Sequence, residues 1–297
     1  MIERIQFAKP MLKHLKEDGF LCADMHFHTK YSDTFTRPKS IVKLAAKRRV
    51  GVAITDHNHI KGCIEAHKEN KRYGVNIING IEVSTMQGPH LLVYFYNVGD
   101  MKEFYGRYVD GKKGRNPYMI LSTTAEDIVK GAKENNGIVS AAHPRALTTW
   151  DIQKKVERGD IDRSIFKSID CAEVICGILK RKMNLRAVEW AQKKGMGITG
   201  GSDGHTLFNL GSVVTYSKTD TVNSFLDSVR KKKSFVAGTE SRMFPRAISM
   251  SKAASKHARY IGPSMRIYSS LQLQDSIWNI KEKIKNGRAR LRAIKRR

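Results

Sequence analysis

The chain has 297 residues, enough for one large domain and an extension, and it carries 54 lysines and arginines against 28 aspartates and glutamates. The formal charge of +26 favours polyanionic binding partners such as nucleic acid, phosphorylated substrates or an anionic membrane surface. The longest apolar run, residues 91–96, is far shorter than the roughly 20 residues of a membrane span, so a transmembrane protein is excluded.

The four cysteines, Cys22, Cys63, Cys171 and Cys176, contain no C-x-x-C pair. The first residues also lack the charged and then apolar pattern of a secretory leader. We therefore expect a reducing, cytoplasmic setting.

The expected elements begin with a short amphipathic helix over residues 1–19 that ends at Gly19 and packs beside the main domain. Apolar runs rich in β-branched residues then alternate with amphipathic helical patterns to about residue 240. The expected strands cover residues 20–28, 51–57, 75–83, 90–96, 137–143, 171–176 and 195–203, and the expected helices cover residues 39–49, 63–74, 101–109, 125–137 and 184–195. A further strand, helix and strand follow Asp203. Such repeated units predict an α/β domain over residues 20–241 with a parallel sheet, open or closed.

Residues 242–297 differ in composition, since they contain 15 basic and 2 acidic residues and so carry +13 of the total charge. Leu273, Ile277, Ile280 and Ile284 recur at helical spacing before an arginine-rich end. Such a basic C-terminal helical tail suits an anionic membrane surface, a nucleic-acid backbone or the domain itself, which it would cap while its basic end stays disordered. The sequence leaves these three roles open.

Eight histidines and acids lie on or within two residues of an expected strand end. His26 and His28 share one face of their strand and Met25 and Phe27 the other, because side chains alternate. Seven of the eight lie toward the C-terminal side of their strands, where the loops of a barrel build its site. His90 starts its strand, and periodicity does not place it. The eight are His26, His28, His57, Glu82, His90, His143, Asp203 and His205.

Imidazole and carboxylate donors without nearby thiolates suit Mn²⁺, Zn²⁺ or Fe²⁺ and disfavour a structural zinc finger. An acid such as Glu82 could bridge two ions at the roughly 3.5–4 Å separation found in two-metal hydrolases. Each residue alone could be a structural hydrogen-bonding group. Eight of them at the ends of six of the seven expected strands predict a multinuclear metallohydrolase.

Six sequence blocks support this interpretation: DMHFHTKYSD, AITDHN, GIEVS, PHLLVYFY, SAAHPR and GSDGH. Over about residues 20–210 they resemble, in order, the motifs of the PHP (polymerase and histidinol phosphatase) superfamily of metal-dependent phosphoesterases. The resemblance implies a distorted (β/α)7 barrel with up to three divalent ions at the C-terminal rim of its strands. It implies one ion held by His26, His28, Glu82 and Asp203, a second by Glu82, His90 and His143, and a third by Asp33, His57 and His205.

Three further residues are candidates for supporting roles. Arg145, directly after His143, could clamp a phosphate group through its planar guanidinium, or it could be a surface arginine. His59 could contact the substrate or stand on an exposed loop. Asp24 is expected to orient an imidazole through a hydrogen bond.

The resemblance implies hydrolysis of a phosphate ester by a metal-activated water, as in a phosphatase or a 5'-to-3' exonuclease. The substrate would be a nucleotide, an oligonucleotide or another small phosphorylated metabolite. The alternative is a non-catalytic nucleic-acid-binding module stabilised by metal, which the complete ligand set disfavours. The sequence does not distinguish monoester from diester cleavage, and it leaves the native metal and the oligomeric state open.

Overall fold

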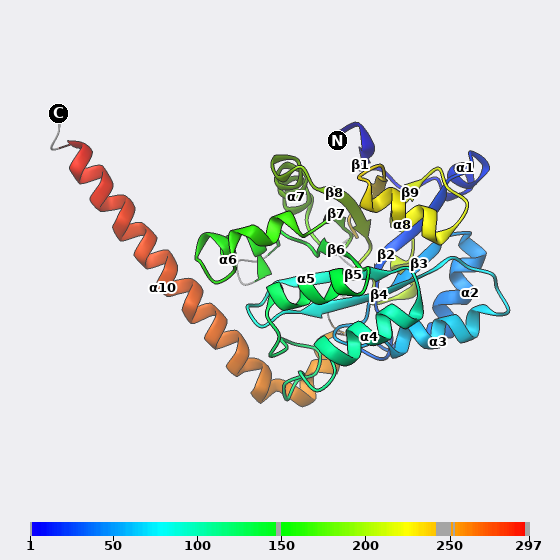
Figure 1. Cartoon of the computed structure of the whole chain (residues 1–297), viewed down its shortest axis with the longest axis horizontal. Helices are drawn as coiled ribbons and strands as arrows, with labels where there is room; N and C mark the ends of the chain where they lie inside the picture. Colours follow the sequence, from blue (N-terminus) through cyan, green and yellow to red (C-terminus); the bar gives the residue numbers. More distant parts are fainter. Residues whose placement is uncertain (1, 147–149, 242–250, 252, 295–297) are drawn as a thin grey trace.

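The computed structural model describes residues 2–146, 150–241, 251 and 253–294 of the chain. Ten strands form a single curled sheet in the spatial order β1-β10-β9-β2-β3-β4-β5-β6-β7-β8 (Figure 1). The strands are β1 (Ile5–Gln6), β2 (Leu21–Phe27), β3 (Gly51–Ile54), β4 (Ile77–Ser84), β5 (His90–Phe95), β6 (Ile138–Ala141), β7 (Cys171–Cys176), β8 (Gly197–Gly201), β9 (Val213–Ser217) and β10 (Phe235–Gly238). Seven of them coincide with the strands expected before residue 204, which confirms the α/β architecture.

The ring of strands from β2 to β8 closes at its two ends. Phe27, at the end of β2, forms a parallel bridge with Gly204, which lies just beyond β8. The backbone N–H of His28 donates to the carbonyl of Gly204 at 3.1 Å. A curled sheet that meets itself in this way has the form of the expected barrel, and it brings residues about 175 positions apart to one rim.

The sheet is mixed, so the expectation of a parallel sheet is wrong for two of its strands. Strand β5 runs antiparallel to both β4 and β6, and β9 runs antiparallel to β2 and β10. The link between β4 and β5, residues 85–89, is a hairpin loop that is too short for the dozen or more residues of a parallel crossover. The hairpin sets Ser84 opposite His90.

The helices cover the outer face of the sheet (Figure 1). Helix α5 shows why: Ala125, Ile128, Val129 and Ala132 recur at helical spacing and are buried, and Thr124 caps the helix by accepting from the N–H of Asp127. The helices are α1 (Leu12–Glu17), α2 (Pro38–Arg48), α3 (Lys61–Asn70), α4 (Val98–Tyr108), α5 (Ala125–Glu134), α6 (Ile152–Glu157), α7 (Arg181–Lys194), α8 (Val222–Arg230) and α10 (Ile261–Ile294). Helix α6 was not expected from the sequence, because its six residues are too few for a periodic pattern.

The N-terminal segment is only partly helical. Strand β1 pairs in parallel with β10, and Pro10 separates it from the short helix α1. The prediction of one amphipathic helix over residues 1–19 is therefore wrong for its first half.

Two groups of buried apolar side chains form the core. The larger lies between the sheet and the helices, and the smaller joins side chains of β2 to β6 with Phe225, Leu226 and Val229 of α8. Met25 packs in the smaller group and Phe27 in the larger one, so these two do not share a face as expected. The cause is an irregularity in β2, whose pairing with β3 shifts register between Asp24 and Phe27.

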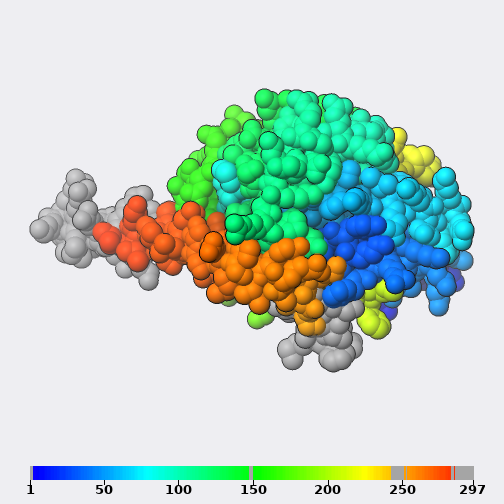
Figure 2. All heavy atoms as spheres, turned by 90° about the horizontal axis from the view of Figure 1, so that it is seen from below, coloured from blue at the N-terminus to red at the C-terminus, as the bar shows by residue number. Residues whose placement is uncertain are grey.

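Helix α10 begins against the body of the molecule and then leaves it. In Figure 2 its orange start lies on the surface of the barrel, and in Figure 1 its red end points away from every other element. The sequence pattern correctly predicts a helix here. In the described part of the chain no helix is long and apolar enough to cross a bilayer. All four cysteines are buried and free.

Candidate metal centre and active site

The nine side chains that the family resemblance singled out converge on one rim of the barrel. They come from the ends of β2, β3, β6 and β8 and the loops that follow, from within β4, and from the start of β5. His90 belongs to this rim because β5 runs antiparallel, so its beginning lies beside the C-terminal ends of its neighbours. The nine residues are His26, His28, Asp33, His57, Glu82, His90, His143, Asp203 and His205.

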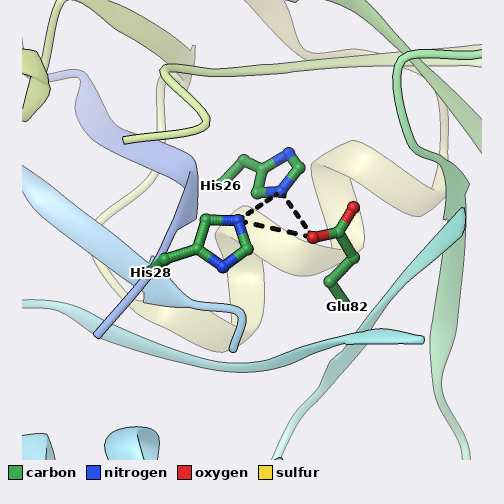
Figure 3. Close-up of side chains that lie close together, drawn as sticks. All are labelled: His26, His28 and Glu82. Atoms are coloured by element: carbon green, nitrogen blue, oxygen red, sulfur yellow. Dashed lines mark hydrogen bonds and ion pairs between the residues drawn. The ribbon is translucent and has the colours of Figure 1, made fainter. Parts of the chain in front are cut away.

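Glu82 lies at the centre of this group and is 1% exposed. Its two carboxylate oxygens face five imidazoles, two on Oε1 and three on Oε2, and Figure 3 shows two of these pointing toward it. Oε1 lies 2.9 Å from His90 Nδ1 and 3.2 Å from His143 Nε2. Oε2 lies 3.1 Å from His26 Nε2, 3.1 Å from His57 Nδ1 and 3.4 Å from His28 Nε2. A carboxylate in this position can be shared between ions.

The remaining two acids complete the rim. Asp203 Oδ1 lies 3.0 Å from His28 Nε2 and 3.5 Å from His26 Nε2. Asp33 Oδ2 lies 2.8 Å from His205 Nε2 and 3.7 Å from His57 Nε2. Three sets of donor atoms are close enough to surround a cation: His26, His28 and Glu82; His28, Asp33 and His205; and His57, Glu82 and His90.

These sets overlap with the ligand groups implied by the family resemblance but differ at one residue. The resemblance assigns His57 to the ion held by Asp33 and His205. In the structure His57 is joined to Glu82 by a parallel bridge and stands nearer to that carboxylate than to Asp33. His57 is thus placed between the donor set that contains Glu82 and His90 and the donor set that contains Asp33 and His205.

The acids of the rim are held in their charged forms. Burial raises the pKa of the Glu82 carboxyl, but His57, His26 and His90 outweigh it and keep that pKa well below its usual value. The pKa of Asp203 is likewise low because His26 and His28 outweigh its burial.

The pKa values of the imidazoles are shifted in two directions by burial and by the nearby carboxylates. Burial lowers the pKa of His57 to about 3, since the nearby carboxylates only partly offset it. Burial also acts on His205, but Asp33 outweighs it and raises the pKa of His205 to about 9. The rim carboxylates therefore favour the protonated form of imidazoles such as His205, and a divalent cation bound there would replace protons of this kind.

The donor set fits divalent metal ions. His26 Nε2 and His28 Nε2 lie 3.1 Å apart and both face Asp203, so two nitrogen lone pairs and a carboxylate converge. Among the described residues, buried His143 Nδ1 has no hydrogen-bond partner. Nitrogen and carboxylate donors suit Mn²⁺, Zn²⁺ or Fe²⁺.

Glu173, which the sequence analysis missed, contacts two of the metal-ligand candidates. Its Oε1 lies 3.0 Å from His26 Nδ1, and its Oε2 accepts from the backbone N–H of His143 at 2.8 Å. It thereby turns His26 Nε2 toward the centre. The available signal was one acid, 1% exposed in the structure, inside the apolar strand sequence CAEVIC.

Asp24 has a different role from the expected one. Its carboxylate touches no imidazole ring and accepts instead from the backbone N–H groups of Ser202 and Gly211, at 2.8 and 2.9 Å. It therefore fixes the loop that carries Asp203 against β2. Alternation along β2 places Asp24 on the same face as His26, but its two carboxylate oxygens are taken by backbone N–H groups distant in sequence.

Backbone conformation at the rim is unusual at two of the nine positions. His143 has a φ of 30° and Asp203 a φ of 50°, both in the left-handed region that non-glycine residues rarely adopt. Gly201 precedes Asp203 where β8 meets β2, and a Cβ atom there would lie 2.4 Å from His26 Cβ. This close approach requires glycine.

Arg145 and His59 are not among the residues that line the cavity above the rim. Arg145 Nη1 lies 2.7 Å from Asp151 Oδ2, an acid that also caps α6. His59 Nδ1 accepts from the backbone N–H of Lys61 at 3.1 Å, and its ring lies over Tyr105. Burial and nearby lysines lower the pKa of His59 to about 4. Neither geometry supports a contact with substrate.

A cavity of about 720 Å³ opens directly above the metal-ligand candidates. Asp33, His57, Glu82, His90 and Asp203 form part of its floor. Its size falls within the roughly 300–1,000 Å³ typical of small-molecule sites.

Comparison with known proteins identifies the architecture. The PHP domain model matches residues 24–145, and the PHP-associated model matches residues 181–234. An uncharacterised protein of Methanocaldococcus jannaschii is 34% identical over 134 residues, which are 41% of this chain and 67% of that protein. The chain belongs to the PHP family. It is therefore a member of a family of metal-dependent hydrolases acting on phosphoric ester bonds.

Other PHP proteins show how far the similarity extends. The 5'-3' exoribonuclease of Salmonella typhimurium is 29% identical over 154 residues, which are 44% of this chain and 52% of that enzyme. The chain thus matches only about half the length of that relative. The fold is shared with a two-domain protein of Bacteroides vulgatus that contains a PHP-like metal-dependent phosphoesterase, with a TM-score of 0.54 at 16% identity over 79% of this chain and 68% of that one.

Proposed function

We propose that this PHP protein hydrolyses phosphate esters at a site of up to three divalent metal ions, with a nucleotide, an oligonucleotide or another small phosphorylated metabolite as substrate. The observation that carries the proposal is the convergence of nine side chains with nitrogen or oxygen donors, the shared carboxylate of Glu82 at their centre, below an open cavity. A structural metal site has no need of such an opening.

The roles of the side chains follow from their positions. His26, His28, Glu82 and Asp203 would hold one ion, and Glu82 would share a second with His90 and His143. Asp33 and His205 would hold a third, with His28 or His57 beside them. Ions bound there supply an acidified water and neutralise charge on the phosphate oxygens.

The protein's own contribution is to hold these donors rigidly. Glu173 fixes the ring of His26, and Asp24 fixes the loop of Asp203. Because every one of the acids concerned is nearly or fully buried, water competes little for the donor atoms. The arrangement supports positioning and charge neutralisation, the two main needs of phosphoryl transfer.

One observation favours a nucleotide or oligonucleotide among phosphate esters: one relative is named as an exoribonuclease. The net charge of +26 attracts anionic substrates of every kind and does not separate these from other phosphate esters. Mn²⁺, Zn²⁺ and Fe²⁺ all suit the donor set.

The test is a product analysis. The full chain is incubated with Mn²⁺ and either a short 5'-phosphorylated oligoribonucleotide or a nucleoside 3',5'-bisphosphate, and the products are resolved by mass. We expect release of mononucleotides or of free phosphate, lost with chelator and in Asp203→Ala. Asp220→Ala, which changes an exposed aspartate, is the matched control and should retain full activity. Turnover that survives in Asp203→Ala would contradict the proposal.

A further inference from the structure

The walls of the cavity differ from its floor. Above the metal-ligand candidates the lining is largely apolar and includes Tyr118, Trp150, Met183, Tyr268 and Leu271. Lys180 is the one lysine or arginine among the described residues that line it. The large positive charge of the chain is therefore not concentrated where a substrate would extend away from the metal centre.

Part of this lining comes from beyond both matched family models, the second of which ends at residue 234. Residues 253–271 supply Ala253, His257, Tyr268 and Leu271, and they lie over the cavity as a roof. Figure 2 shows the start of α10 lying on the barrel surface. We call residues 253–275 the roof segment.

The roof segment is held to the barrel at both of its ends. Near its start, Asn116 Nδ2 donates to Ser264 Oγ at 2.9 Å and lies 2.9 Å from His257 Nδ1. The ring of Tyr118 meets that of His257 edge-on, with the centroids 5.7 Å apart. The roof is therefore built against the cavity wall by specific contacts.

At its C-terminal end the roof segment is held by ion pairs. Asp275, 9% exposed, pairs with Arg158 and lies 3.5 Å from Lys155 Nζ. Lys155 is fully buried, and Asp160 faces both of these basic residues. Removing one member of such a buried cluster leaves an unpaired charge, which is costly.

Aromatic rings lead from the metal centre to the roof. The ring of Trp150 lies 5.6 Å from that of His90, a metal-ligand candidate, and 6.1 Å from that of Tyr268 on α10. Both Trp150 and Tyr268 are half-buried and line the cavity. A planar group bound beside the metal centre would contact the rings of Trp150 and Tyr268.

We infer that the roof segment forms the binding subsite for the non-phosphate part of the substrate, a single aromatic group of nucleobase size that rests against Trp150 and Tyr268. This inference rests on the proposed function, since it assumes that a phosphate group lies at the metal centre. It makes the substrate a mononucleotide or a very short oligonucleotide. A long strand is disfavoured because proteins that follow a strand use an open, positively charged groove, and this cavity is roofed and contains one lysine.

The first test compares substrates with and without a base. The full chain with Mn²⁺ is assayed on adenosine 5'-monophosphate and on ribose 5-phosphate, as wild type and as Tyr268→Ala. We expect Tyr268→Ala to lower kcat/KM for the adenosine nucleotide by roughly tenfold, the order of the loss when one stacking partner is removed. The loss should appear in KM, and ribose 5-phosphate should be unaffected. Leu273→Ala, which changes an exposed residue of the same helix, is the control.

Equal losses on both substrates, or no loss on either, would overturn the inference. Calorimetric titration of the metal-free chain with adenosine 5'-monophosphate separates this outcome from a failure of the proposed function. Binding weakened by Tyr268→Ala without turnover in any variant keeps the base subsite and rejects the phosphoesterase. Binding unchanged by Tyr268→Ala rejects the subsite even where turnover is found.

The second test concerns length. Asp275→Asn removes the charge that pairs with Arg158 and Lys155 without altering a cavity-lining side chain. We expect wild type to prefer a 5'-phosphorylated dinucleotide over a long oligoribonucleotide, and Asp275→Asn to reduce this preference several-fold by raising activity on the long strand. Gln274→Ala, at an exposed neighbouring position, should leave the preference unchanged. An Asp275→Asn preference equal to that of wild type, or a wild type that prefers the long strand, would contradict a size-selecting roof.

Discussion

The rim of the barrel and the roof segment bound the same cavity but are stabilised in different ways. At the rim each acid is nearly or fully buried, has several partners, and comes from a closed ring of strands. Most of the roof segment belongs to one helix, α10, on which Leu271 and Asp275 are buried while Met265 and Leu273 are exposed. In the two proposals above, chemistry depends on the most constrained part of the molecule and selectivity on a segment outside both matched family models. The predictions below test that separation.

The largest effect is expected at the centre of the rim. Glu82→Gln keeps the shape of the side chain but removes the charge that faces five imidazoles. We expect loss of metal-dependent turnover and of stabilisation by Mn²⁺, which for a site filled at 100 times its Kd amounts to roughly 2.7 kcal/mol. Turnover and thermal unfolding with and without Mn²⁺ measure both.

Glu189→Gln is the matched control for this variant, because Glu189 is exposed on α7. It should show the same Mn²⁺ response as wild type. If Glu82→Gln were still stabilised by Mn²⁺ to the wild-type extent, the shared carboxylate could not be the centre of the site.

A smaller effect is expected at Glu173, which contacts His26 but is not itself a metal-ligand candidate. Glu173→Gln weakens the contact that orients His26 without removing a metal-ligand candidate. Loss of such a partner typically reduces metal affinity about 10–100-fold, so we expect a shift of that size in a competition titration with a chelator. Activity at saturating Mn²⁺ should recover in large part. An affinity within twofold of wild type would assign Glu173 to structure alone.

The third prediction concerns the roof. Leu271→Ala removes a side chain that is 5% exposed where α10 meets the barrel. Because α10 packs on the barrel through few side chains, we expect faster proteolysis within the roof segment and an unchanged unfolding midpoint for the barrel. Limited proteolysis followed by mass analysis measures the first, and circular dichroism the second. A fall in the midpoint of the barrel would show that rim and roof are one cooperative unit, against the separation drawn above.

The smallest effect is expected at His59. His59→Ala alters a ring that packs on Tyr105 outside the cavity. We expect kcat/KM to stay within about twofold of wild type, since surface changes away from such features cost little. A tenfold loss on the substrates above would return His59 to the active site and show that the rim extends further than the structure indicates.

Sequence reasoning was sufficient for the rim because strand ends and metal-binding residue types coincide in the chain. His26, His57 and His143 each follow or end an apolar run, so a closed sheet must bring them together. The direction of β5 could not be read from periodicity, because an isolated strand has the same alternation in either direction. Once residues 85–89 are seen as a hairpin, the position of His90 follows.

Other features depended on contacts distant in sequence. Glu173 was missed because its partners, His26 and His143, lie on other strands. The helical pattern of the tail was visible, but the docking of α10 above the cavity is set by tertiary contacts, of Ser264 with Asn116 and of Tyr268 with Trp150. Local pattern identifies an element, while its placement requires the partners.

The hairpin between β4 and β5 also bears on how the site comes together. Glu82 and His90 touch at 2.9 Å and are eight residues apart, whereas His28 and Asp203 touch at 3.0 Å and are 175 residues apart. The entropy lost on closing a loop grows with its length, so the contact between Glu82 and His90 costs less to form than the contact between His28 and Asp203. The shared carboxylate of Glu82 and one of its five imidazole partners, His90, are thereby available within a single local unit of chain. The metal centre can thus assemble from the β4–β5 hairpin, with the other ligand candidates added as the remaining strands pair.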